Sequence, residues 1–381
     1  MTHSVADHAW LPDHQLHVAA TLAHVDATLE RINLLVHQYT AQGPLALQET
    51  AVGNQVNLAV TGISPVPEAL PRLVADALTQ LRAVLEHTVY AEVEHRLARP
   101  LSAQESRALE MPAAVARDGF DEWLTHRWRR HLPPLHSGAA ISQRLRALQP
   151  FQRRDPNEHP LKILVEYTNL AKHRMPTVAA ARLGAVYAAA PHPGLTVSQP
   201  LKMRPQAGDG QPLNIGDVIA SIPRGARVEL SIVSTVSLQR PHTQMWNIAV
   251  NELADLEDWV RTTAIPTLIT GSRDVAPLPP QMDIFSGQND LRSALQSAGA
   301  QSAAERGRQR LQAATALANM LDPIAGIGMS EAISTWVVSL DMPALQQRID
   351  RLSHARSSTR NLRRVVDEIL NEVRAAESGR G

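Results

Sequence analysis

Residues 81–87 read Leu81-Arg82-Ala83-Val84-Leu85-Glu86-His87, and residues 168–174 read Thr168-Asn169-Leu170-Ala171-Lys172-His173-Arg174. Each stretch places a histidine and an arginine inside a helical segment that is otherwise apolar. Burying such side chains costs free energy unless they are paired. Two such stretches in one helical protein therefore indicate either a functional site or a buried polar network that specifies helix packing.

The segments around these stretches are mostly helical. Apolar residues recur at helical spacing from about residue 14 to 39, and a second long helix runs from about 70 to 97 and ends before Pro100. The first stretch lies in the middle of that second helix. A helix over about 161–173 carries the second stretch, and another covers about 246–263. The apolar residues that flank both stretches should face one common core.

Strands are expected in two places. Residues 49–63 alternate loosely and predict one or two strands. Residues 177–190, 218–222 and 226–238 are rich in Val, Ile and Ala, with Pro and Gly between them, and predict a small antiparallel sheet. The expected fold class is α+β and mostly α.

The chain divides into three parts by composition. Residues 1–265 form the helical bundle with a β subdomain at about 175–240, and residues 266–286 are a proline-rich linker. Residues 287–381 form a C-terminal helical region, in which 290–320 and 342–376 are helical.

Composition limits the classes of protein. The chain has 381 residues, 44% of them apolar, and a formal net charge of zero, which excludes a globally basic coat for nucleic acid. It has no cysteine, which excludes disulfides, thiolate nucleophiles and cysteine-ligated zinc. The sequence shows neither a signal peptide nor a transmembrane segment, so we expect a cytoplasmic protein with no membrane contact.

Helix geometry separates the two candidate residues of the first stretch. Arg82 and His87 are five residues apart, which places them about 140° apart around a regular helix. Arg82 and Glu86 stand at i and i+4, the spacing of an ordinary helix salt bridge, so a structural role is the alternative.

The second stretch brings its polar residues closer together. Asn169 and His173 share one helix face at i and i+4, and an asparagine can fix the tautomer of an imidazole. Lys172 and Arg174 flank that face. Alternatively, His173 and Arg174 simply complement the negative end of the helix dipole.

The two stretches resemble a set of uncharacterised bacterial proteins with LRxxLDH and QPY…NxDKHR signatures. Here Glu86 stands for the first Asp, Phe151 follows Gln149-Pro150 in place of Tyr, and Ala171 stands for the second Asp. The order of the segments matches over about residues 14–265. The R-x4-H spacing also resembles that of HEPN domains.

The HEPN resemblance implies a bundle that is often dimeric and acts as a metal-independent ribonuclease, in a defence or toxin–antitoxin setting. In that case Arg82, His87 and His173 would be catalytic, and Glu86, Asn169, Lys172 and Arg174 would support them or bind phosphate. RNA would be the substrate, a second copy of the chain a partner, and neither metal nor cofactor would be needed.

The competing hypothesis is a non-catalytic helical interaction or oligomerisation module. Its Arg/His clusters would be structural, and the C-terminal helices would bind a protein partner.

Two further patterns concern a metal site and RNA binding. His24 lies roughly 10 Å along its helix from Asp13, His14 and His17, too far to complete a metal site with them. A second pattern, within the short helix expected over residues 121–131, combines aromatic rings and cations that could stack and clamp single-stranded RNA. Such a cluster is more often an amphipathic surface helix. Its members are Trp123, Arg127, Trp128, Arg129 and Arg130.

Overall fold

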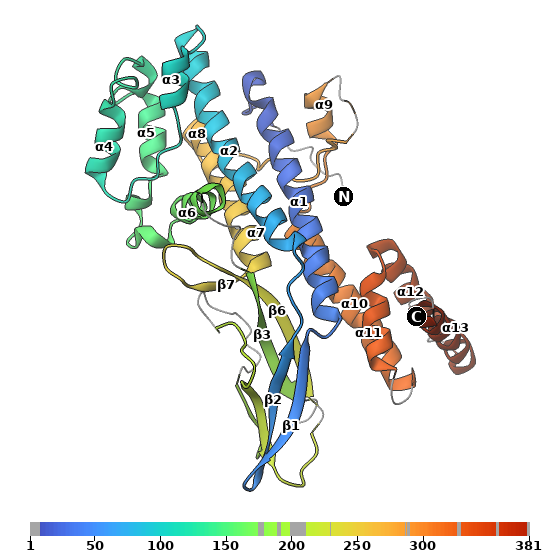
Figure 1. The fold of residues 1–381 in the computed structure, drawn as a ribbon. Coiled ribbons are helices and arrows are strands. Elements are labelled where there is room, and N and C mark those ends of the chain that lie inside the picture. Colours follow the sequence, from blue (N-terminus) through green and yellow to red (C-terminus); the bar gives the residue numbers. More distant parts are fainter. Residues whose placement is uncertain are drawn as a thin grey trace.

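The protein is a mostly helical α+β chain with two small antiparallel sheets (Figure 1). The computed structural model describes residues 8–173, 179–188, 192–198, 211–228, 230–285, 287, 290–325, 329–355 and 358–378. The predicted fold class is confirmed at this level.

Two long antiparallel helices form the axis of the molecule. The short 3-10 turn η1 (Asp13–Gln15) leads into α1 (Leu16–Ala41), and α2 (Ala69–Leu97) returns beside it. Both helices bury an apolar stripe, as their helical periodicity predicts. α2 ends at Leu97, and the next residue, Ala98, takes the left-handed conformation with φ 51°.

A β-hairpin connects these two helices and projects away from the bundle (Figure 1). Its strands are β1 (Leu45–Val52) and β2 (Gln55–Ile63). The turn between them is only two residues long, and Gly53 takes a φ of 59° there, which glycine adopts without steric cost.

The hairpin belongs to a larger β region. One sheet has the order β1-β2-β5-β4, with β5 (Val218–Pro223) and β4 (Thr196–Val197), and the other has the order β3-β6-β7. The strands of the second sheet are β3 (Ala179–Ala188), β6 (Leu230–Gln239) and β7 (Trp246–Ile248).

The prediction of one sheet from residues 177–238 is wrong in one respect, because β5 pairs with β2 of the hairpin rather than with β3 or β6. The physical reason is burial. Val60 of β2 joins Leu183, Val186 and Ile219 in one apolar cluster, so the hairpin and the later strands cover each other.

Short helices lie beside the long pair, from its end remote from the sheets down to its middle (Figure 1). α6 (Pro160–His173) contacts α2, and Leu81, Leu85, Leu161 and Leu164 are buried together in the main core, as expected. The elements of this region are α3 (Ala103–Ala108), α4 (Arg117–Thr125), η2 (Pro133–Leu135), α5 (Ala140–Ala147), η3 (Pro150–Gln152), η4 (Pro156–Glu158) and α6 (Pro160–His173).

The helix after β7 is longer than the sequence indicates. α7 (Ala249–Trp259) continues through a π-helical turn, η5 (Val260–Ala264), into α8 (Ile265–Thr270). Pro266 lies in the first turn of α8, directly after the π-helical turn, where a missing N–H is tolerated. The first residues of the segment expected as a linker are therefore helical, and Leu278 and Met282 further along are buried in the main core.

The C-terminal helices have an apolar core of their own. It contains Leu317, Leu321, Ile333, Trp336 and Val366. The helices are α9 (Leu291–Gln296), which still packs on the main core, and then α10 (Ala303–Ala325), α11 (Ser330–Ser339), α12 (Met342–Ala355) and α13 (Thr359–Ser378).

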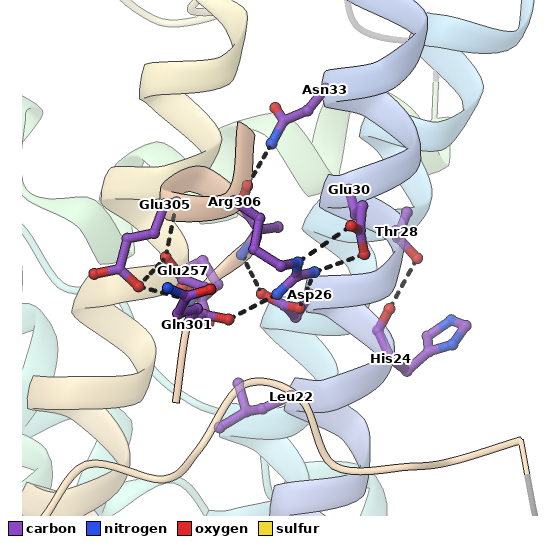
Figure 2. A network of polar contacts seen from close by, with 12 residues as sticks. Leu22, His24, Asp26, Thr28, Glu30, Asn33, Glu257, Gln301, Glu305 and Arg306 are labelled. Carbon is purple, nitrogen blue, oxygen red and sulfur yellow. Dashed lines mark hydrogen bonds and ion pairs between the residues drawn. The ribbon is translucent and has the colours of Figure 1, made fainter. Parts of the chain in front are cut away.

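A polar junction attaches α10 to α1. Figure 2 shows Asp26 and Glu30 of α1 directed at Arg306. Asp26 accepts a hydrogen bond of 2.6 Å from the backbone N–H of Ala303 and another of 2.8 Å from Arg306 Nη2. Asp26 therefore caps the first turn of a helix that lies far away in the sequence.

Within the described part of the chain, no helix combines the length and the apolar character that crossing a membrane requires.

Candidate functional site

Arg82 lies on the buried side of α2, and its guanidinium group is engaged within the protein. Its Nε donates to Glu86 Oε1 at 2.7 Å, and its Nη2 donates to the backbone oxygen of Met111 at 2.6 Å. Only 8% of the residue is exposed. The salt bridge at i and i+4 is the one that the spacing indicates, and the bond to Met111 ties α2 to the segment after α3.

His87 lies on a different face of the same helix and is exposed. Its ring contacts the first helix instead, with its centroid 6.4 Å from that of His17. Arg82 and His87 therefore do not converge on one point, in agreement with their separation of about 140° around a regular helix.

A row of histidines follows the seam between α1 and α2. His14 Nε2 lies 2.9 Å from Glu92 Oε1, and the His14 and His95 rings stack with centroids 4.0 Å apart and planes 10° apart. His17 and His87 continue the row. We refer to His14, His17, His87 and His95 as the seam histidines.

Glu92 is the buried acid behind the seam histidines. Besides His14, it accepts a hydrogen bond from Gln15 Nε2 at 3.2 Å, and Arg96 and Arg144 lie 3.5 and 3.8 Å from its other oxygen. These partners offset the cost of burying its charge. Burial, followed by the nearby His87, lowers the pKa of His17, which favours its neutral form.

Sequence reasoning missed the seam histidines as a group. From the sequence, His14 and His17 are candidates only for a metal site that His24 lies too far away to complete, whereas their partners in the structure come from the other long helix. The sequence contains a signal for this cluster, because two consecutive long helices of similar length that pack antiparallel bring the start of the first beside the end of the second. Among the described residues, no group of three or more potential ligands is arranged to hold a metal ion.

The second stretch lies at the end of α6. Asn169 and Lys172 are exposed, whereas Tyr167 and Thr168 face the core. His173 is the last residue of α6; its side chain and the whole of Arg174 lie outside the described residues. The structure therefore brings neither Asn169 nor Lys172 into the Arg82 contacts.

The polar network of this region uses other residues. Arg240 donates to Glu252 Oε1 from Nε at 2.7 Å and to Glu158 Oε2 from Nη1 at 2.6 Å. The Tyr167 hydroxyl lies 3.4 Å from Glu252 Oε1. Arg240 and Glu252 are both buried, and the network joins the residue that follows β6 to η4, α6 and α7. It involves residues far apart in sequence, which no local motif indicates.

Comparison of the chain with protein-family models, with curated proteins and with solved structures gave no match.

Proposed function

We propose that this chain is a non-catalytic helical interaction module, in which Arg82 and Glu86 stabilise the bundle. The observation that carries the proposal is the engagement of Arg82 by Glu86 and by the Met111 backbone oxygen at 8% exposure. An arginine that stabilises a phosphorane must present its N–H groups to a substrate. Two of these donors are already satisfied inside the protein.

In this proposal, the C-terminal helices bind a protein partner, and the chain also binds a second copy of itself. The separate core of α10–α13 supports this part of the proposal, since such a unit keeps its own shape while its outer faces stay available. Sedimentation velocity across a concentration series tests the formation of homo-oligomers.

A HEPN-like, metal-independent ribonuclease is the second candidate, and the pair of His17 and His87 favours it. His17, with its lowered pKa, could take the proton of a ribose 2′-hydroxyl, and His87 could protonate the leaving oxygen. In this candidate Arg82 and His173 complete the catalytic set, and Glu86, Asn169, Lys172 and Arg174 support it. A role in bacterial defence or a toxin–antitoxin pair would follow.

Incubation of the purified protein with total RNA in EDTA separates the two candidates. The proposal predicts no cleavage above the buffer control by the wild type, by His87→Ala or by His17→Ala. Cleavage by the wild type that both substitutions abolish, with melting temperatures unchanged, would favour the ribonuclease instead.

A further inference from the structure

The turn that follows α4 combines exposed cations and an exposed aromatic ring. Residues 126–136 read His-Arg-Trp-Arg-Arg-His-Leu-Pro-Pro-Leu-His, with three arginines, three histidines and no acidic residue. α4 ends at Thr125, earlier than the sequence predicts, so these residues form tight turns rather than a continued helix. We call residues 126–136 the basic turn.

Part of the basic turn is structural and fixes its shape. Arg129 is 7% exposed, and it donates to the backbone oxygens of Trp123 and Ala108. Its guanidinium also lies over the Trp123 ring, 4.3 Å from the centroid. Leu132 and Leu135 are buried as well, so these side chains anchor the backbone of the turn on the protein core. Trp123 and Arg129 are thereby removed from the cluster that the sequence indicated.

The remaining polar side chains of the basic turn face outward. Arg127, Trp128, Arg130 and the turn's histidines are exposed, with Trp128 at 37%. The Arg127 guanidinium lies 5.2 Å from the Trp128 ring centroid, and Arg130 Nε donates to His131 Nε2 at 3.3 Å. The turn therefore exposes an aromatic ring with the Arg127 guanidinium over it and a second exposed arginine, Arg130, two residues further along the chain.

The neighbouring acids leave the surface with an excess of positive charge. Asp121 forms an ion pair with Arg146, and Glu110 lies 3.9 Å from the buried Arg129, so each already has a cationic partner. Asp118 and Glu122 are the other acids on α4, and the exposed cations Arg117, Arg127 and Arg130 outnumber them.

We infer that the basic turn binds single-stranded polynucleotide, with Trp128 stacking on a base and Arg127 and Arg130 contacting the adjacent phosphates. Base stacking on an aromatic side chain and arginine contacts to phosphate are the two elements of such recognition. A membrane surface is a poorer fit, because Trp128 is the only large apolar side chain that the described turn exposes. This inference goes beyond the proposed function, because it adds a polynucleotide to the protein partners of the interaction module.

Fluorescence titration with labelled twelve-residue oligo(dT), oligo(U) and a duplex of equal length tests the inference. We expect both single strands to bind more tightly than the duplex. The affinities for oligo(dT) and oligo(U) show whether the basic turn prefers DNA or RNA. Trp128→Ala should weaken binding about tenfold, and Trp128→Phe should restore most of it because the ring is kept. Arg127→Ala/Arg130→Ala should lower the slope of log Kd against log salt by about 1.4, or 0.7 per phosphate contact.

The matched control is Arg360→Ala/Arg363→Ala, which removes the same charge from exposed positions on α13. It should bind like the wild type. Equal affinity of Trp128→Ala and wild type, absence of single-strand binding, or binding only to anionic phospholipid vesicles would each overturn the inference. Cleavage of RNA by attack of the ribose 2′-hydroxyl would contradict the proposed function. Oligo(dT) has no 2′-hydroxyl and cannot be cleaved in this way, so its binding to the basic turn can still be measured in that case.

Discussion

His159 shows how a single residue can set the acid sensitivity of this fold. It lies just before α6, is 5% exposed, and its Nδ1 accepts the backbone N–H of Leu161 at 3.1 Å. Its ring also meets Trp259 edge-on, with centroids 5.4 Å apart. Burial, followed by the charges of Arg153 and Arg273, lowers the pKa of His159 to about 4. Protonation would both bury a charge and remove the acceptor of the α6 cap.

The sign of the resulting pH dependence is fixed by this lowered pKa. Between the folded pKa of about 4 and the unfolded value of 6.5, the unfolded chain binds more protons, so stability falls as the pH falls. The loss from this group is on the order of 3 kcal/mol between pH 7 and pH 4. In urea unfolding, the free energy of unfolding of His159→Asn should change less with pH in that range than that of the wild type. His24→Asn, at an exposed position on α1, should keep the wild-type profile; an identical profile for His159→Asn would contradict this role.

At the residue scale, the sequence predicts what is local. The spacing of Arg82 and Glu86 predicts their salt bridge, and the separation of Arg82 and His87 by about 140° predicts that they diverge. The bond from Arg82 to Met111 and the pairing of His14 with Glu92 depend on how distant segments pack. No spacing rule contains that information.

At the element scale, the junction of α10 with α1 depends on Asp26. Asp26 is 2% exposed and holds both Ala303 N–H and Arg306, whereas Glu30 holds the same arginine from an exposed position (Figure 2). Asp26→Ala should lower the free energy of unfolding by about 3 kcal/mol, because it breaks a buried pair and removes a helix cap. Glu30→Ala is the matched control and should cost less than about 1 kcal/mol. Equal costs in urea unfolding would show that the cap is unimportant.

Elements were predictable where periodicity is strong. The long helices on either side of the hairpin follow from their apolar spacing. The pairing of β5 with β2 was not predictable, because alternation identifies a strand but not its neighbour. The helix through Pro266 was missed since a π-helical turn, which has no sequence signature, accommodates the proline.

At the scale of the whole molecule, the two larger of the three apolar clusters among the described residues lie in different parts of the chain. Leu321 belongs to the core of α10–α13, and Leu22 to the main core. Leu321→Ala should destabilise its own core by about 2–5 kcal/mol. Hydrogen exchange should then accelerate in α11–α13 and stay unchanged in α2 and α6. Leu22→Ala should give the opposite pattern, and uniform acceleration by either variant would indicate a single cooperative unit.

The central claim is that Arg82 serves the stability of the bundle rather than a reaction. The most direct test of this claim compares the free energies of unfolding in urea of Arg82→Ala, His87→Ala and the wild type. The account predicts a loss of about 1–3 kcal/mol for Arg82→Ala, because the buried Met111 backbone oxygen and the half-buried Glu86 carboxylate both lose their partner. It predicts a change within about 0.5 kcal/mol for the exposed His87→Ala. Wild-type stability of Arg82→Ala would contradict the account.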